Sequence, residues 1–187
     1  IQNEKISMVQ AATGAGKSIG IPLMILSFIC RDLPVASNNT GWFGLDKNKR
    51  PRVFWVTQRV SAVFSVSDTM IKVLYSMLNI DSVSTAYGHG HDSTSTGVRD
   101  TPFFIGTAMA FLLGLEELME FLPSSALPNG PVVHFILDDL IVNDPAYQIV
   151  MVLAQSWQQR GYVKLWCSNA DLSCLNLPDD GTADWLD

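Results

Sequence analysis

Residues 11–18 read Ala-Ala-Thr-Gly-Ala-Gly-Lys-Ser, and this stretch decides the fold. Glycines at positions 14 and 16 would let backbone N–H groups turn inward around an anion. Lys17 would reach the outer phosphate oxygens of a bound nucleotide, and the hydroxyl of Ser18 would hold Mg²⁺. The stretch therefore predicts a phosphate-binding loop made by Thr13, Gly14, Ala15, Gly16, Lys17 and Ser18.

A loop of this kind needs a strand before it and a helix after it. Residues 5–9 turn apolar in the manner of a short buried strand, and residues 19–30 are apolar on nearly every face. The second run predicts a core helix that is too short to span a bilayer. A Gly-Lys-Ser that merely occurs in a turn would not explain this agreement of strand, loop and helix.

Strand-like and helix-like segments alternate along the rest of the chain. Strands are expected at 53–57, 103–106, 132–137 and 163–167, and helices at 60–78, 107–121 and 146–160. Such alternation is typical of an α/β three-layer sandwich, with a mostly parallel sheet and helices on both faces. The loop that follows the first strand then lies at the carboxyl edge of the sheet, where these folds bind ligands.

Three segments interrupt the alternation. Residues 31–52 are expected to be an exposed loop excursion, whose basic residues leave open a contact with an anionic partner: Lys47, Lys49, Arg50 and Arg52. Residues 79–101 read as a polar loop. A metal site there would need His89, His91 and Asp92, which no further ligands accompany. Residues 176–187 are expected to be an acidic tail or an interdomain linker.

The composition fits one domain with a substantial core. The chain has 187 residues, of which 48% are hydrophobic, and a net charge of −6. This charge argues against non-specific affinity for nucleic acids, which depends on Lys and Arg. The three cysteines show no paired spacing, so we expect reduced thiols and a cytoplasmic location. Because the sequence begins at Ile1, almost inside the first strand, we expect residues 1–187 to be one domain of a longer protein.

The second half of a nucleotide site is expected after residue 132. Val-Val-His-Phe-Ile-Leu-Asp-Asp, residues 132–139, places two aspartates at the end of an apolar strand. In phosphate-loop enzymes an acidic residue at such a place helps to hold Mg²⁺. Asp138 would have this role, and Asp139 would lie beside the attacking water. Taken alone, the two aspartates would fit the end of a strand and a turn equally well; the loop at 11–18 favours the metal site.

These motifs and their order resemble those of superfamily 2 helicases, in particular the DEAH/DExH branch and the helicases of positive-strand RNA viruses. The likeness runs from residue 5 to about 175 and rests most firmly on the loop at 11–18, which resembles motif I. The other segments are weaker individually. They resemble motifs Ia, Ib, II and III at 56–62, 105–107, 138–141 and 166–170.

The resemblance implies the first RecA-like domain of an RNA helicase that binds ATP and Mg²⁺. Its catalytic residues would be Lys17, Asp138 and Asp139. It implies contacts with the backbone of single-stranded RNA through Thr57, Arg59 and Thr107, and a role for Ser168 in coupling. It also implies a second RecA-like domain in the parent protein, no membrane span, and a location in the host cytoplasm if the protein is viral.

Four positions in motifs II and III depart from the pattern of the family. Asp139 replaces a Glu that positions the attacking water, and a displacement of about 1 Å can cost about a hundredfold in rate. Ile141 replaces a His that links the nucleotide and nucleic-acid sites. In the segment that resembles motif III, Asn169 replaces an Ala and Ala170 replaces a Thr. Arginine fingers from a second domain contribute about 10³ to 10⁵ in rate. We therefore expect the isolated domain to hydrolyse ATP very slowly.

Two other functions stay open. The departures would suit a degenerate helicase fold that serves as an interaction module with a vestigial nucleotide site. A small phosphate-loop kinase is the other alternative. Such kinases need a lid with arginines over the transferred phosphate, and the arginines of this sequence are scattered.

Overall fold

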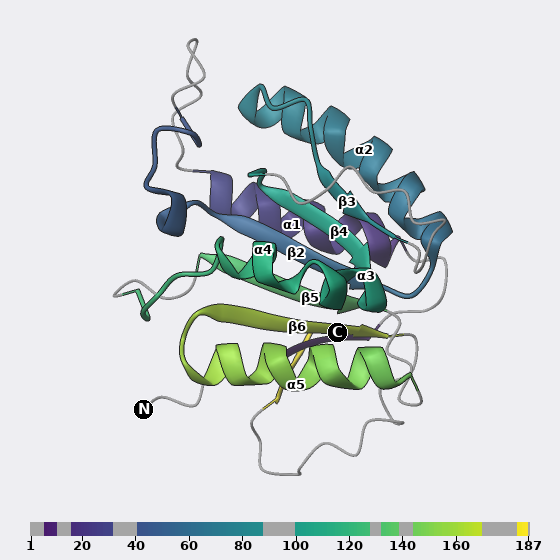
Figure 1. Cartoon of the computed structure of the whole chain (residues 1–187). Helices are drawn as coiled ribbons and strands as arrows, with labels where there is room; N and C mark the ends of the chain where they lie inside the picture. Colours follow the sequence, from purple (N-terminus) through teal and green to yellow (C-terminus); the bar gives the residue numbers. More distant parts are fainter. Residues whose placement is uncertain are drawn as a thin grey trace.

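Parallel strands form a single sheet through the centre of the molecule (Figure 1). The computed structural model describes residues 6–10, 16–31, 41–87, 100–127, 132–138, 144–169 and 183–186. The strands are β1 (Ile6–Gln10), β2 (Arg52–Thr57), β3 (Ser84–Ala86), β4 (Phe103–Thr107), β5 (Val133–Asp138), β6 (Val163–Asn169) and β7 (Ala183–Leu186). They pair in the order β3-β4-β2-β5-β6-β1-β7, and every pairing is parallel.

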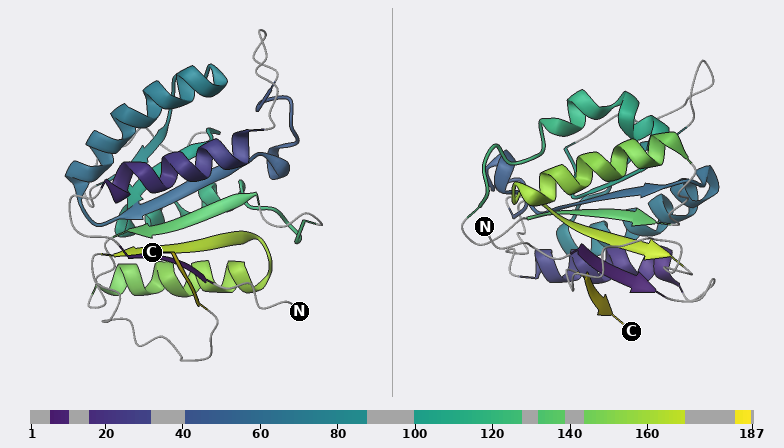
Figure 2. Two further views of the ribbon diagram at one scale, coloured as in Figure 1. Left: turned by 180° about the vertical axis from the view of Figure 1, so that it is seen from behind. Right: turned by 90° about the horizontal axis from the view of Figure 1, so that it is seen from below.

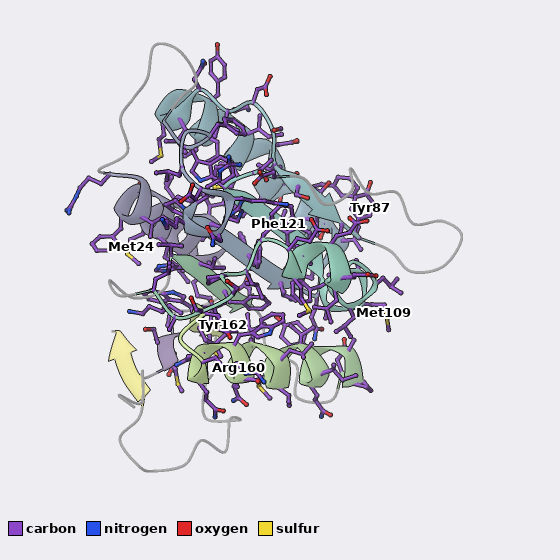
Figure 3. All side chains as sticks on the ribbon, turned by 60° about the vertical axis from the view of Figure 1, so that its left-hand side comes forward. Met24, Tyr87, Met109, Phe121, Arg160 and Tyr162 are labelled. Atoms are coloured by element: carbon purple, nitrogen blue, oxygen red, sulfur yellow. The ribbon has the colours of Figure 1, made fainter. Side chains whose placement is uncertain are left out.

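Helices cover both faces of this sheet, as Figure 1 and the reverse view in Figure 2 show. One face carries α1 (Lys17–Cys30) and α2 (Val60–Leu78); the other carries α3 (Ala108–Leu113), α4 (Leu115–Met119) and α5 (Pro145–Gln159). Figure 3 shows Met24 of α1 and Met109 of α3 extending from opposite sides of the molecule.

The strands alternate their side chains between two apolar cores. Val53 and Trp55 of β2 pack in the core beneath α1 and α2, whereas Phe54 and Val56 belong to the core beneath α3 and α5. Because both faces of β2 are covered, every residue of the strand is buried. The predicted fold class, an α/β three-layer sandwich with a parallel sheet, is confirmed.

The expectation that α1 is buried on all faces is wrong. Met24 and Phe28 are 52% and 66% exposed, while Ile25 and Leu26 are buried against the sheet. A helix that covers one face of a sheet and packs beside α2 buries one side only. Apolar residues occupy the outer side as well, which is why the sequence alone suggested a core helix.

Short elements lie where the sequence predicted none. Ser84–Ala86 forms the edge strand β3 inside the expected polar loop at 79–101, and Ala183–Leu186 forms β7 inside the expected acidic tail. The helix expected at 107–121 is broken at Gly114 into α3 and α4. Thr107 does begin this helical region, because its hydroxyl accepts a hydrogen bond from the backbone N–H of Ala110 at 3.4 Å.

The segment expected to be an exposed excursion, 31–52, is partly packed. Residues 46–49, which include the short 3₁₀ helix η1 (Lys47–Lys49), are exposed as expected. Trp42, however, is buried, and its indole N–H donates to the carbonyl of Pro51 at 2.8 Å. The end of the excursion is therefore anchored to the start of β2. Residues 32–40 lie outside the described residues.

The four basic residues at the end of this segment each have an acidic partner within the chain. The pairs are Lys47 with Glu120, Lys49 with Asp46, and both Arg50 and Arg52 with Asp100. Three carboxylates thus offset much of the charge of these four side chains, and the arrangement gives no support to the contact with an anionic partner that the sequence left open.

Within the ranges that the structure describes, none of the helices combines the length and apolar character needed to cross a lipid bilayer. The same part of the chain contains no cluster of three or more His, Cys, Asp or Glu side chains that would hold a metal ion. The expected metal alternative at His89, His91 and Asp92 lies outside it.

Candidate functional site

The helix that follows the glycine-rich stretch begins on a left-handed residue. Gly16 has φ 79° and ψ 14°, a conformation that side chains disfavour. Its carbonyl accepts hydrogen bonds from the N–H groups of Ile19 at 3.2 Å and Gly20 at 2.7 Å. Lys17 and Ser18 therefore occupy the first turn of α1. Because no side chain among the described residues caps this turn and no acidic residue lies in it, its N–H groups and dipole suit an anion.

Ser18 and Asp138 meet although 120 residues separate them in the sequence. The Ser18 hydroxyl donates to Oδ2 of the Asp138 carboxylate at 3.2 Å. Asp138 is the last residue of β5 and is 2% exposed, whereas Ser18 is half-buried. The fold thus brings together the two residues that the sequence predicted as metal ligands.

The geometry of this pair fits Mg²⁺. Magnesium binds oxygen ligands in an octahedron at about 2.0–2.1 Å, which places neighbouring ligands about 3 Å apart. The two oxygens of the pair are separated by 3.2 Å. Magnesium sites of nucleotide enzymes use one or two protein oxygens together with phosphates and water, so a hydroxyl and a carboxylate form a sufficient protein share.

Four of the predicted site residues lie at one edge and on one face of the sheet. Thr57, Thr107 and Asp138 each end a strand, and Ser168 is the last but one residue of β6. Each follows by two positions a side chain packed under α1 and α2: Trp55, Ile105, Ile136 and Trp166. Strand side chains alternate, so the four also lie on this face. The parallel sheet gathers them at its carboxyl edge, beside the start of α1.

The sheet order places Ser168 between the two halves of the candidate nucleotide site. Its backbone is in register with Val9 of β1 on one side and Asp138 of β5 on the other. The side chain is 1% exposed, and its hydroxyl has no hydrogen-bond partner among the described residues. An unsatisfied buried hydroxyl is uncommon in a native core and is often found at a functional site.

The residues predicted to contact nucleic acid differ in exposure. Arg59 is exposed and Thr107 is half-buried. Thr57 is 1% exposed, and its hydroxyl accepts a hydrogen bond from the backbone N–H of Arg59 at 3.4 Å. The hydroxyl of Thr57 therefore shapes the turn after β2, and we no longer expect this side chain to contact a partner.

Several predicted site residues lie outside the described residues. These are Thr13, Gly14, Ala15 and Asp139, and the departures Ile141 and Ala170. Lys17 is described and is half-buried in the first turn of α1.

The sequence reasoning missed Tyr147, which lies in the first turn of α5. This tyrosine is 2% exposed, and its hydroxyl contacts the backbone carbonyls of Val56 and Asp138. The signal in the sequence was the pair Asp144-Pro145, a typical helix start that places residue 147 on the first turn. Nothing in the pattern indicated which strands that turn would face.

Cys167 illustrates a side chain with no part in this chemistry. It is buried in the core beneath α5, and burial raises the pKa of its thiol to about 12. A neutral buried thiol is a poor nucleophile.

No protein-family model matches the chain, and no curated protein matches it significantly.

Proposed function

We propose that this chain is the ATP-binding domain of an RNA helicase, a motor driven by nucleoside triphosphates. The observation that carries the proposal is the contact between Ser18 and Asp138 at the start of α1. It joins the first helical turn after a glycine-rich loop to the acidic end of a buried strand. This pairing is the one that holds Mg²⁺ in phosphate-loop enzymes.

Different described residues would bind the phosphates and the Mg²⁺ ion. The N–H groups at the start of α1 would receive the phosphates, and the ammonium group of Lys17 would balance their charge. Ser18 and Asp138 would hold Mg²⁺, which when bound neutralises charge on the β- and γ-phosphates. Asp138 is suited to this task because its carboxylate is buried and lies within hydrogen-bond distance of Ser18.

RNA would lie along the same edge of the sheet. Arg59 is exposed just after β2, and Thr107 is accessible at the end of the neighbouring strand β4. Their strands are adjacent, so the two side chains fit successive contacts with one sugar–phosphate backbone. Contacts of this kind hold a strand without reading its sequence. We propose single-stranded RNA as the partner and weak binding by this acidic domain alone.

Nucleotide binding can be tested by melting the protein with and without ATP and Mg²⁺. A ligand at a hundred times its dissociation constant stabilises a protein by about 2.7 kcal/mol, which corresponds to about 7 °C for a domain of this size. We expect Lys17→Ala to abolish this shift while the melting temperature without nucleotide stays close to that of the wild type.

The matched control is Lys72→Ala, which removes an exposed lysine on α2. This variant should keep the full shift. If Lys17→Ala also keeps it, the assignment of the phosphate site is wrong. If the wild-type protein shows no shift at millimolar nucleotide, the domain is better described as a degenerate interaction module.

A further inference from the structure

Tyr147 joins the ends of two strands from the face opposite the candidate nucleotide site. Its ring lies in the core beneath α3 and α5, and its hydroxyl is 2.9 Å from the carbonyl oxygen of Val56. The same hydroxyl also contacts the carbonyl oxygen of Asp138. A phenol has one proton to donate, so the two carbonyls share a single donor.

The two carbonyls belong to different parts of the proposed machinery. Asp138 carries the carboxylate that accepts from Ser18 on the other face of the sheet. Val56 immediately precedes Thr57, whose hydroxyl holds the turn that presents Arg59. One buried hydroxyl therefore fixes the backbone beneath the metal ligand relative to the backbone beneath the exposed arginine.

The local sequence holds Tyr147 in place. Asp144 caps α5, and its carboxylate accepts from the N–H groups of Ala146 at 2.9 Å and Tyr147 at 3.4 Å. Pro145 occupies the first helical turn, where its fixed φ is favourable. The tyrosine is thus anchored through its backbone by the cap and through its ring by the core.

We propose that Tyr147 is a positioning residue that couples nucleotide binding to RNA binding. The inference rests on the proposed function and adds the connection between its two sites. When a ligand shifts the end of β5, the carbonyl of Asp138 moves relative to the Tyr147 hydroxyl. The hydrogen bond from that hydroxyl to the carbonyl of Val56 then changes as well, so the shift reaches the end of β2. Coupling between two binding sites is reciprocal, so RNA must affect nucleotide affinity by the same factor.

The test measures that factor. The dissociation constant of a fluorescent, non-hydrolysable ATP analogue with Mg²⁺ is determined without RNA and with saturating oligouridine. The ratio of these two dissociation constants, the larger over the smaller, is the coupling factor. We expect it to lie in the usual range of about 5 to 150 for the wild type and close to one for Tyr147→Phe. Nucleotide affinity without RNA should weaken by about tenfold at most, the worth of one hydrogen bond.

Tyr162→Phe is the matched control. It removes another tyrosine hydroxyl that donates to a backbone carbonyl, that of Ser124 at 3.4 Å, near the far end of α5 (Figure 3). This variant should keep the wild-type ratio. A hydroxyl that only stabilises the fold would lower the melting temperature of Tyr147→Phe and leave the ratio unchanged, which would overturn the inference.

A second pair of variants leaves the tyrosine intact. Asp144→Ala removes the cap and should lower the ratio, whereas Asp144→Ser can still cap the helix and should restore it. If the wild-type protein binds no nucleotide, the proposed function itself fails. If it binds nucleotide but RNA does not change the affinity, or if Tyr147→Phe keeps the wild-type ratio, only the coupling is disproved.

Discussion

Gly16 shows what a single residue contributes to the candidate site. Its φ of 79° is reached easily only by glycine, and a Cβ at this position would meet no atom of the described residues within 4 Å. As far as the described residues are concerned, the requirement is conformational and not a matter of space. A left-handed backbone costs an L-residue about 1–2 kcal/mol. The motif alone predicted a role for Gly16 in the loop, and its left-handed backbone gives the physical reason why a glycine is needed there.

His134 is a buried titratable group on the same face of the sheet. It is 7% exposed, stacks on Trp166, and accepts a hydrogen bond from the indole N–H of Trp166 through Nδ1 at 3.0 Å. Burial, with a smaller contribution from Lys164, lowers the pKa of this imidazole to about 4. The native protein therefore holds the ring neutral while it accepts from Trp166.

This histidine predicts a loss of stability in mild acid. Below pH 6.5 the unfolded chain binds a proton at His134, whereas the folded protein binds it only near pH 4. As the pH is lowered from 6.5 to about 4, the free energy of unfolding should therefore fall by about 1.4 kcal/mol per pH unit, about 3 kcal/mol in total. His134→Gln keeps an acceptor but does not titrate. Urea unfolding across this pH range should show a correspondingly weaker dependence for the variant, and parallel curves would contradict the assignment.

Among the elements, β2 begins on a buried charge. Arg52 is 1% exposed, and its guanidinium lies over the rings of Trp42 and Phe121 at 4.9 Å each. Asp100, just before β4, pairs with both Arg52 and Arg50. Desolvation acts to lower the pKa of Arg52, and Asp100 opposes this. The cluster fastens the segment before β2 to the segment before β4 at the amino edge of the sheet.

Replacement of Asp100 should lower the free energy of unfolding, because the buried charge of Arg52 would lose its partner. Loss of one partner from a fully buried pair costs about 3–5 kcal/mol because a charge is left unpaired in the core. The carboxylate side chain of Asp100 is 33% exposed, so we expect Asp100→Asn to cost rather less, about 2–3 kcal/mol of unfolding free energy. Asp46→Asn, which breaks the exposed pair with Lys49, should leave chemical denaturation unchanged. Equal effects of the two variants would contradict a structural role for the cluster.

Elements with an apolar pattern of their own could be predicted from the sequence, whereas the edge strand β3 and the break at Gly114 could not. The helix expected at 60–78 is present with those bounds, because its apolar residues recur at helical spacing over many turns. Ser84–Ala86 has three small residues and no pattern of its own; it is a strand only because β4 lies beside it. Gly114 breaks the helical region after Thr107, a break that the continuous apolar pattern concealed.

At the scale of the whole molecule, the chain order of strands says little about their neighbours. Strand β6 lies between β1 and β5, so the segment that resembles motif III separates the two strands that lead into the candidate nucleotide site. The sequence predicted that Ser18 and Asp138 act together, since they lie in the segments that resemble motifs I and II. It could not predict that the hydroxyl of Tyr147 in α5 would contact the ends of both β2 and β5, because that depends on how α5 packs on the opposite face of the sheet.

Calorimetric titration of the protein with ATP, first with Mg²⁺ and then with a chelator present, tests the central claim most directly. If Ser18 and Asp138 hold a metal between the protein and the phosphates, one ATP should bind per chain, and removal of Mg²⁺ should weaken the affinity. In Asp138→Asn the affinity with Mg²⁺ should fall towards the value without it, because the amide is a poorer ligand for the ion. No binding at millimolar ATP, or binding that is the same with and without Mg²⁺, would contradict the account.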